Sequence, residues 1–530
     1  AIFEERRSVL LVTKKTRTRW RHRLDRHRRM YREMSIMLIY WAVVLLCASG
    51  DSQDPDVKVE PPREVVRLRE LRMRKAWDSY AYERRAESNS RATAALAGAA
   101  NLRSAARQGL ALTFSVKDYG ALGDGQHDDA PAFAAAVAAA RKARAEGSKL
   151  RHVVYFPKQS SKRYKMSSML LQNIDELEVR IDGRIAVVPM AEFAAPPEEQ
   201  PWLSPEQQRM QYAFFGVYNC SDIRITGGGS IDGNGQSWWR IRRRTPIKRA
   251  PILLLIRDSS QVSVHLLELT ESPFYHLVVL RSQHVALQRL NISAGAGSVN
   301  TDGIDVLDSQ HVEVVDCWVS TGDDNVAIKE GARDVSVRGG YFARGHGLSI
   351  GSLGEGGSSM DSSVRDVDLR DVRFIKTTNA ARVKTWRGGA GVVSNVTFAN
   401  IRVYGVGIPL VVDQFYCAAS QHPGPCTNET SAVAITDLTV DGIRGWHTSG
   451  VAAMVHCSDA APCTADLRNF RLEGQPGCSN VIRCWAVQPL TSDGDNTGRR
   501  ISHTRPCGQG NEMHGYIFDI SRQERRQVSR

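Results

Sequence analysis

Two adjacent carboxylates stand in the segment TGDDN, residues 321–325, within a stretch whose alternating apolar residues otherwise predict a β-strand. Neighbouring side chains of a strand point to opposite faces, so Asp323 and Asp324 can share one groove only if the chain bends beside them. Gly322 permits such a bend. Crowded carboxylates raise one another's pKa, so that one stays protonated while another is ionised, as acid and base catalysis requires. The segment is therefore the first candidate for a catalytic site.

A third carboxylate and an imidazole stand at equal spacings from this pair. Asp302, in NTDG, precedes Asp324 by 22 residues, and His346, in GHG, follows it by 22 residues. If the chain coils with about this period, such positions stack on neighbouring coils, roughly 4.8 Å apart. We therefore expect one patch that holds three acidic groups and an imidazole.

Two cations follow in the segment Arg382-Val383-Lys384. In a strand, Arg382 and Lys384 point to one face and Val383 to the other. Arginine can hold a carboxylate through two hydrogen bonds, and lysine supplements it as a point charge. Alone, this pattern is typical of any exposed strand. Beside three carboxylates it predicts a site that binds an anionic substrate.

Short repeated strands must position these groups. From about residue 220 the chain returns to one pattern of alternating apolar residues, with central valines 23 to 32 residues apart at Val262, Val285, Val312, Val335, Val367 and Val396. These steps leave no room for a helix between every two strands, which disfavours α/β folds. A leucine-rich repeat would show L-x-x-L-x-L, which is missing. We predict an all-β solenoid, a parallel β-helix.

Residues 114–143 predict a strand, a Gly-rich turn and an alanine-rich helix that caps the open end of the solenoid. Asp124, Asp128 and Asp129 resemble a metal-binding loop, but acidic residues are also favoured where a helix begins, and we prefer that interpretation. We expect the solenoid to span residues 113–490, between a charged linker or propeptide (51–112) and a C-terminal tail (491–530).

The N-terminal 50 residues combine a basic segment with an apolar run, Ile36 to Ala48. The run is short for a membrane span but suits a signal peptide, and small residues follow it. A signal anchor is the alternative, and Met30 and Met34 are candidate initiators. Most of the +13 net charge falls in residues 1–110. The near-neutral remainder therefore argues against a nucleic-acid partner.

The ten cysteines fit an oxidising compartment, since nine of them follow Cys47. Close pairs predict short disulfide loops at Cys417/Cys426, Cys457/Cys463 and Cys478/Cys484, with Cys507 unassigned. A zinc site is disfavoured, because no C-x2-C spacing occurs. Four glycosylation sequons are compatible with secretion, at Asn219, Asn291, Asn395 and Asn428.

In order along the chain, the motifs NTDG, GDD, GHGLSIGS and R-V-K resemble those of the polygalacturonases, pectin-degrading glycoside hydrolases built on a right-handed parallel β-helix. SIDGNGQSWW (230–239) and VVDQFYC (411–417) also match. The resemblance covers residues 113–490. It implies that Asp323 is the general acid, that Asp302 and Asp324 activate water, and that His346 lies beside the acid. The galacturonate-binding residues it implies are Asn300, Arg382, Lys384 and Tyr416.

The resemblance further implies a secreted, extracellular enzyme of the cell wall, monomeric, acting on polygalacturonate without cofactor or metal and without stable membrane association once the signal is removed. It implies inversion of configuration. Inverting enzymes usually separate their two carboxyl groups by about 6.5 to 9.5 Å, whereas stacking on adjacent coils predicts a value nearer the 5 Å of retaining enzymes. For stereochemistry we follow the resemblance, since the distance rule need not apply where two acids jointly hold the water, whereas endo or exo action stays open.

Many relatives have a cysteine directly after the paired aspartates and another just before G-H-G. Here these places hold Asn325 and the pair Ala343-Arg344, which predicts the loss of a brace without loss of chemistry. The alternative functions are a rhamnogalacturonan hydrolase, a pectate lyase whose aspartates bind calcium, and a non-catalytic β-helix adhesin.

Overall fold

The structure is a computed structural model that describes residues 111–159, 162–192, 212–243, 250–355, 362–417, 432–458, 460–461 and 463–474, together with three strands nearer the C-terminus. All of them belong to the second of two compact units, Asn101–Arg530. The expected signal segment and residues 51–110 of the expected linker lie outside the described residues, as do Cys426, Cys478, Cys507 and Asn428, whereas residues 111 and 112 belong to the first strand of the solenoid. Within the described part, no helix is long and apolar enough to cross a membrane.

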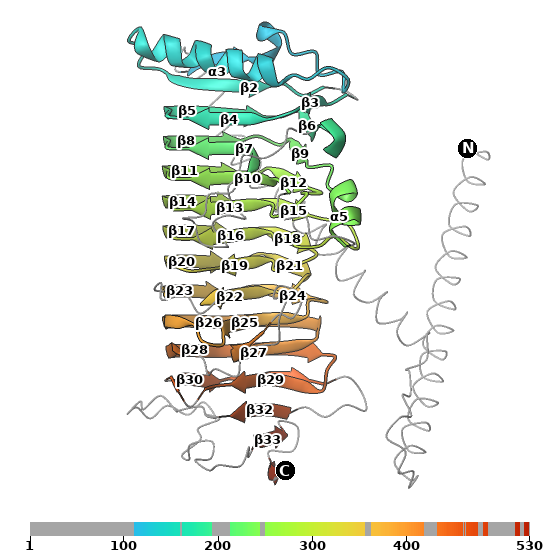
Figure 1. Cartoon of the computed structure of the whole chain (residues 1–530), viewed down its shortest axis with the longest axis vertical. Helices are drawn as coiled ribbons and strands as arrows, with labels where there is room; N and C mark the ends of the chain where they lie inside the picture. Colours follow the sequence, from blue (N-terminus) through green and yellow to red (C-terminus); the bar gives the residue numbers. More distant parts are fainter. Residues whose placement is uncertain are drawn as a thin grey trace, which may run out of the picture. The chain divides into compact units, whose positions relative to one another are not determined.

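Short strands stack coil upon coil into two long sheets, which we call sheet A and sheet B (Figure 1). Sheet A contains β1 (Ala111–Ser115), β2 (Arg151–Phe156), β3 (Tyr164–Met166), β5 (Asp175–Ile181), β6 (Arg184–Val187), β8 (Ser221–Thr226), β9 (Ser230–Asp232), β11 (Ser260–His265), β12 (Glu268–Thr270), β14 (Gln283–Gln288), β15 (Asn291–Ser293), β17 (Gln310–Val315), β18 (Trp318–Thr321), β20 (Arg333–Arg338), β21 (Tyr341–Arg344), β23 (Val364–Arg370), β24 (Arg373–Ile375), β26 (Ala390–Val406), β28 (Ala432–His447), β30 (Cys463–Arg468) and β31 (Arg471–Glu473).

Sheet B contains β4 (Met169–Gln172), β7 (Ala213–Tyr218), β10 (Ile252–Arg257), β13 (Leu277–Leu280), β16 (Ile304–Leu307), β19 (Val326–Ile328), β22 (Leu348–Leu353), β25 (Asn379–Trp386), β27 (Ile408–Tyr416), β29 (Val451–His456), β32 (Val481–Trp485), β33 (Gly515–Asp519) and β34 (Glu524–Val528). A typical coil passes once through sheet B and then through sheet A. Pairing is parallel up to β32, and β33 and β34, within residues 491–530, add antiparallel strands.

The valines from which the repeat was inferred lie on top of one another in successive coils, as predicted. Val262 pairs with Val285, Val285 with Val312, and the series continues in register through Val335, Val367 and Val396. These side chains are buried in one continuous core between the sheets. The predicted right-handed parallel β-helix is confirmed, and its register follows from the requirement that each coil bury its apolar face against its neighbours.

The bends between strands explain why polar residues punctuate the pattern. Asp258 and Asp308 follow sheet B strands with φ of 52° and 48°, and Asp334 bends the start of β20 with φ of 51°. Asparagine, aspartate and glycine tolerate this left-handed conformation better than other residues. The primary role of the repeated Asn and Asp residues is therefore to form the turns between strands.

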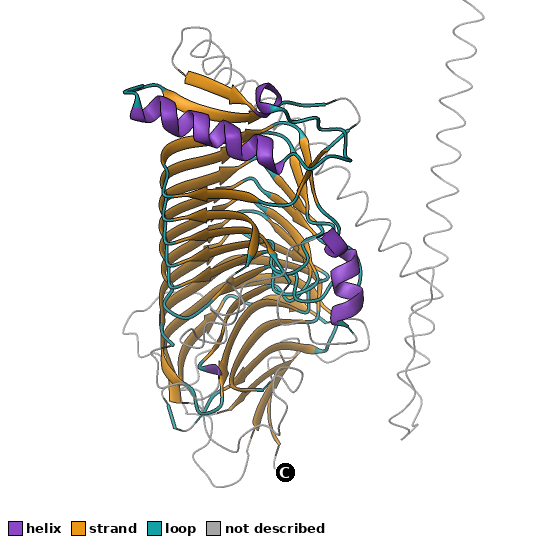
Figure 2. Cartoon of the chain, turned by 45° about the horizontal axis from the view of Figure 1, so that its top comes forward, coloured by secondary structure: helices purple, strands orange, loops and turns teal. Residues whose placement is uncertain are grey.

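The N-terminal end of the solenoid is covered by α3 (Ala130–Ala145), beside the short helix η1 (Val116–Tyr119), as predicted (Figure 2). Phe133 and Ala136 of α3 are buried against the core. Asp129 stands at the N-cap, but its side chain does not cap the helix; its carboxylate accepts hydrogen bonds from the N–H groups of Leu122 and Gly123, at 2.6 and 3.0 Å. The carboxylate of Asp129 therefore closes the turn that precedes the helix. A second short helix, η2 (Met190–Glu192), lies further along the chain.

Helix α5 (Gln236–Arg242) covers part of the outer face of sheet B. Trp238 and Trp239 pack there with Leu255 and Val278 in a separate apolar cluster. Further along the stack, several outward positions of sheet B are polar, among them Asp305 of β16, Ser349 of β22 and Lys384 of β25. The stretch of sheet B after α5 therefore offers a polar surface on an otherwise apolar scaffold.

The cysteines agree with the expectation where they are described. Cys457 and Cys463 form a disulfide, as predicted, and Cys417 is also disulfide-bonded. Cys220 and Cys317 are free and buried. Burial raises the pKa of the Cys317 thiol to about 12, so this group is an apolar core residue without nucleophilic character.

Candidate active site

The predicted ladder of Asp302, Asp324 and His346 is present in the turns that precede β16, β19 and β22. Register pairs Ile304 with Val326 and Val326 with Leu348, which carries the 22-residue spacing into the turns. The N–H of Gly303 donates to the carbonyl of Asp324, 2.9 Å away, and this hydrogen bond ties the two turns directly. Equal spacing in sequence thus becomes stacking in space.

The bend that brings both aspartates to one side depends on close backbone contact. A Cβ atom on Gly322 would lie 2.3 Å from Ser298 Oγ, so glycine is required there for space. Gly345 adopts a φ of +60°, and a Cβ there would lie 2.3 Å from the carbonyl oxygen of Asp323. Gly322 thus lets the turn of the paired aspartates approach the preceding coil at Ser298, and Gly345 lets the turn of His346 approach Asp323.

Asp324 is buried and surrounded by cations. Its carboxylate lies 2.5 Å from Arg382 Nη2 and 3.0 Å from Lys384 Nζ, and it accepts a hydrogen bond from Ser349 Oγ at 2.9 Å. Burial alone would raise the pKa of Asp324, but Arg382 and Lys384 hold it well below its usual range. Asp324 is therefore the ionised member of the pair.

Asp323 is more accessible and lies between an amide and an imidazole. Asn300 Nδ2 donates to Asp323 Oδ2 at 3.2 Å, and His346 Nδ1 lies 2.8 Å from Asp323 Oδ1. Burial works against the imidazolium, but hydrogen bonds and charges from Asp323 and Asp324 outweigh it and raise the pKa of His346 to about 9. His346 is thus a cation at neutral pH, positioned beside the carboxyl that the resemblance assigns as the acid.

Asp302 is buried, and it has the opposite electrostatic environment to Asp324. Burial and the neighbouring carboxylates of Asp323, Asp305 and Asp324 raise the pKa of Asp302 well above its usual value. Within the described residues, Asp302 Oδ1 has no hydrogen-bond partner. A buried carboxyl oxygen that needs a donor is suited to hold a water molecule. The site thus contains carboxyl groups with opposite protonation tendencies.

The remaining predicted residues line the downstream part of the same surface. Lys384 Nζ lies 5.3 Å from the centroid of the Tyr416 ring, and Trp386 packs edge-on against that ring. A register shift between β25 and β27 sets two residues of β27, Gln414 and Phe415, opposite the single residue Thr385 of β25, so Tyr416 follows a local bulge. The sequence pattern could not show this bulge.

Three groups at the site were not predicted. Ser349 donates to Asp324 and accepts from Arg382 Nε at 3.0 Å. Arg242, at the end of α5, donates to Asn300 Oδ1 at 2.8 Å and lies over the Phe274 ring. The third is the ion pair of buried Asp305 with Lys329, at 3.5 Å. Ser349 could have been found from its pairing with Arg382 in register, but nothing in the repeat pointed to Arg242.

Asp323, Asp324 and His346 offer ligand atoms within 4.8 Å of one another, close enough to hold a metal ion. Protein cations, however, already neutralise this cluster, since Arg382, Lys384 and the protonated His346 surround Asp324. A divalent ion would have to displace these charges. The arrangement therefore favours an anionic organic substrate over a resident cation.

Asn325, where the chain departs from its relatives, is buried in the turn. Its side-chain N–H groups point to the carbonyl of Ala343 and to Thr321 Oγ1, both at 3.3 Å, and its Oδ1 accepts from the N–H of Gly347 at 3.0 Å. The expected loss of a brace is therefore compensated, because an amide links the two turns through hydrogen bonds.

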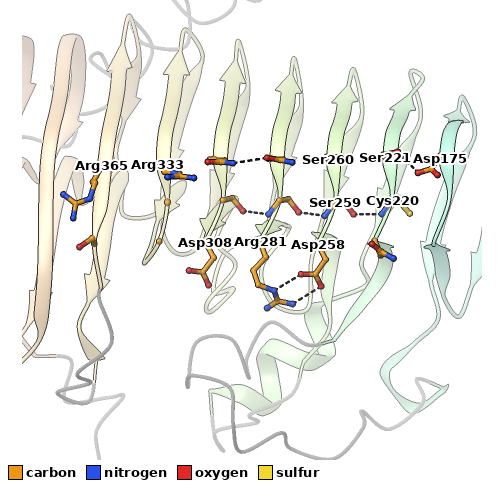
Figure 3. Close-up of a pocket in the computed structure, with 18 residues that line it drawn as sticks. Asp175, Cys220, Ser221, Asp258, Ser259, Ser260, Arg281, Asp308, Arg333 and Arg365 are labelled. Carbon is orange, nitrogen blue, oxygen red and sulfur yellow. Dashed lines mark hydrogen bonds and ion pairs between the residues drawn. The ribbon is translucent and has the colours of Figure 1, made fainter.

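A second hollow, of about 970 Å³, lies at the edge of sheet B where its strands end and those of sheet A begin (Figure 3). This edge is opposite to the one where Asp302, Asp324 and His346 lie, and none of the predicted site residues lines the hollow. Its floor is a ladder of buried serines in which the N–H of Ser259 donates to Ser282 Oγ and that of Ser282 donates to Ser309 Oγ. Beside the ladder, Asp258 and Arg281 pair through two hydrogen bonds of 2.7 and 2.9 Å. We call this hollow the serine groove.

The chain resembles known proteins over most of the solenoid. Residues 157–491 match Glycosyl hydrolases family 28. A polygalacturonase of Juniperus ashei is 34% identical over 368 residues, covering 68% of this chain and 67% of that protein. A polygalacturonase of Persea americana is 32% identical over 389 residues, covering 72% and 79%.

Solved structures show the same fold. The polygalacturonase from Erwinia carotovora ssp. carotovora superposes with a TM-score of 0.57 at 22% identity, covering 72% of this chain and 97% of that one. The endo-xylogalacturonan hydrolase from Aspergillus tubingensis gives 0.56 at 23% identity, covering 75% and 99%. The extent of the family match and the identity to these relatives lead to one conclusion: the chain belongs to glycosyl hydrolases family 28.

Proposed function

We propose that this protein is a polygalacturonase that hydrolyses α-1,4 bonds between galacturonic acid units of pectin. The observation that carries the proposal is the placement of Asp323 between His346 and Asn300, beside a buried Asp324 held by Arg382 and Lys384. A carboxyl pair can cleave a glycosidic bond, and adjacent cations can hold a uronate. The curated relatives named above are polygalacturonases.

In the proposed reaction, Asp323 protonates the glycosidic oxygen of the leaving sugar. It is the most accessible of the three aspartates, with 21% of its side chain exposed against 3% for Asp324. His346 Nδ1 lies 2.8 Å from Asp323 Oδ1 and 3.6 Å from Asp324 Oδ1, so the imidazole can pass the proton that Asp324 takes from the water on to Asp323 after each turnover. Asp323 is thus the carboxyl group that can both reach the substrate and be reprotonated.

Asp302 and Asp324 hold and deprotonate the attacking water. Asp302 Oδ1 can accept one hydrogen bond from it, and Asp324 supplies the negative charge. Galacturonate carboxylates, when bound, would share Arg382 and Lys384 with Asp324. That sharing weakens the grip of the cations on Asp324 and makes it a stronger base in the substrate complex than in the free enzyme.

Single displacement on this site inverts the anomeric carbon. The ligand oxygens of Asp323 and Asp324 lie within 4.8 Å of each other, below the usual separation in inverting enzymes. We propose inversion nonetheless, because two acids share the water and the simple pair rule does not describe them. Proton NMR of the first product tests this: a β anomer is expected from the α-linked substrate, and an initial α anomer would contradict it.

Incubation of the purified protein with polygalacturonate tests the activity itself. We expect reducing ends to accumulate, as a ladder of oligomers for endo action or as monomer alone for exo action. A pectate lyase would instead form an unsaturated product that absorbs ultraviolet light and would be abolished by a chelator. We expect chelator-resistant cleavage without that absorbance. A protein that binds polygalacturonate without cleaving it would favour the adhesin alternative.

The proposed setting is extracellular, in the cell wall, where the substrate is found, and we propose a monomer. The described coils stack only on one another, and α3 covers the N-terminal end. Light scattering of the purified protein tests the oligomeric state. Assay of culture medium against cell extract from an expressing eukaryotic cell tests secretion.

A further inference from the structure

A further cation stands on the coil that carries Arg382 and Lys384. Arg387 follows β25, and its guanidinium lies over the ring of Phe415, 5.3 Å from the centroid. Arg387 Nε also donates to the carbonyl oxygen of Phe415, 3.4 Å away. The arginine is thus fixed against β27, immediately beside Tyr416.

The aromatic ring under Arg387 is itself held by the next coil. Phe415 packs against His456, the last residue of β29, with ring centroids 4.5 Å apart. Arg387, Phe415 and His456 are each partly exposed, and 40% of the His456 side chain is accessible. These three residues, which we call the downstream stack, form a continuous layer across three coils.

The downstream stack lies on the same face as the proposed substrate-binding cations. Lys384 pairs in register with Asp413, and Asp413 pairs with His456, so all three side chains point outward from sheet B. Phe415 lies in the bulge of β27 and precedes Tyr416, over whose ring Lys384 Nζ lies. A polymer bound at Lys384 and Tyr416 would continue over Phe415 and Arg387.

We infer that the downstream stack is an additional subsite, in which Arg387 binds the carboxylate of a further uronic acid unit of the substrate chain. The inference rests on the proposed function and adds a specificity-determining residue to it. Burial, reinforced by Arg387 and opposed by Asp413, lowers the pKa of His456. His456 is thus neutral at pH 7 and can exchange hydrogen bonds with sugar hydroxyls.

Asp413, which lies in register between Lys384 and His456, is held by neighbouring residues. Its Oδ1 accepts a hydrogen bond from the N–H of Phe415 at 2.9 Å and lies 3.7 Å from His456 Nδ1. The two charges of the subsite should therefore act in opposite directions on an anionic ligand. Arg387 should strengthen its binding, and Asp413 should weaken it.

The test compares Arg387→Gln with the wild type on galacturonate oligomers of increasing length. We expect KM to be unchanged for the shortest cleaved oligomer and to rise about 10-fold for longer ones, the effect of losing one charge-assisted hydrogen bond. Arg387→Lys should recover part of the loss, and Asp413→Asn should not raise KM. Arg338→Gln, on the exposed face of sheet A, is the matched control and should match the wild type.

Calorimetric binding of the same oligomers gives a readout that does not need turnover. Equal affinity of wild type and Arg387→Gln at every length would overturn the subsite, as would a KM change that is the same at every length. A wild type that binds but does not cleave would overturn the proposed function alone. A wild type that neither binds nor cleaves galacturonate oligomers would overturn both.

Discussion

The two edges of sheet B carry polar ladders built by the same coils but of opposite character. At the serine groove, like residues stack on like, as Ser259, Ser282 and Ser309 do, and each satisfies the next. At the edge that holds the candidate active site, unlike residues stack, so that a carboxyl of raised pKa, a carboxylate of lowered pKa and an imidazolium share one patch. Where identical polar groups stack, each one satisfies the hydrogen-bonding capacity of the next. Where unlike polar groups stack, some of them keep charge or hydrogen-bonding capacity that can act on a ligand.

Burial separates the two edges further. Asp258 and Arg281 of the serine groove have side chains 43% and 38% exposed, whereas Asp324 and Arg382 are 3% and 14% exposed. Charges in water interact weakly, and charges withdrawn from water interact strongly. Two Arg–Asp ion pairs in different surroundings therefore have different consequences, and the following substitutions test this difference.

The largest effect is expected from removing the proposed acid. Asp323→Asn should lower kcat on polygalacturonate by about 100-fold or more, the usual contribution of a positioned general acid. Asp258→Asn, at the serine groove, should leave kcat unchanged. Reducing-end assays of both proteins check this, and near-normal turnover of Asp323→Asn would remove Asp323 from the role.

The second test concerns stability. Arg382→Met leaves the buried Asp324 with Lys384 as its main cation and should lower the free energy of unfolding by about 2 to 3 kcal/mol at pH 7. Arg281→Met breaks an exposed pair and should cost less than about 1 kcal/mol. Denaturant titration of both variants measures the difference. Equal losses would show that burial does not distinguish the two edges.

A smaller effect is expected at Arg242, which holds the Oδ1 of Asn300 while the Nδ2 faces Asp323. Arg242→Met should free the amide to rotate and lower kcat about 10-fold, as loss of one charge-assisted hydrogen bond predicts. Arg240→Met, on the exposed side of the same helix, is the control. The two variants would behave alike if α5 merely covers sheet B.

The smallest effect is a pH dependence. His346 has a pKa raised from 6.5 to about 9, so its ion pairs stabilise the folded protein fully below 6.5 and are lost as the pH rises through about 9. The wild type should therefore lose more stability between pH 7 and 10 than His346→Gln does. Thermal unfolding across this range measures the difference, and parallel curves for the two proteins would contradict the raised pKa.

Much of the fold could be predicted because apolar residues recur along the chain at intervals of one coil. Val312 and Val335 alternate with polar neighbours and recur within one coil length, which specifies both the strand and its partner. The ladder of Asp302, Asp324 and His346 was predictable for the same reason, because equal spacing in a solenoid means stacking.

The rest depends on places where the repeat is interrupted. Arg242 lies on a helix inserted between coils, so its distance from Asn300 follows from the packing of Trp238 and Trp239 on sheet B. The contacts of Phe415 depend on a bulge that alternation cannot show. Asp129 was predicted at a helix start, but its hydrogen bonds to the preceding loop depend on loop geometry.

The hydrogen bonds of Asn325 have a consequence for the redox behaviour of the enzyme. An amide, unlike a disulfide, is indifferent to thiols, so the catalytic turn needs no oxidant to form and does not open in reductant. The disulfide between Cys457 and Cys463 lies on later coils of the solenoid. A reducing compartment would therefore loosen the C-terminal coils first, while the carboxylates at the centre of the solenoid kept their arrangement.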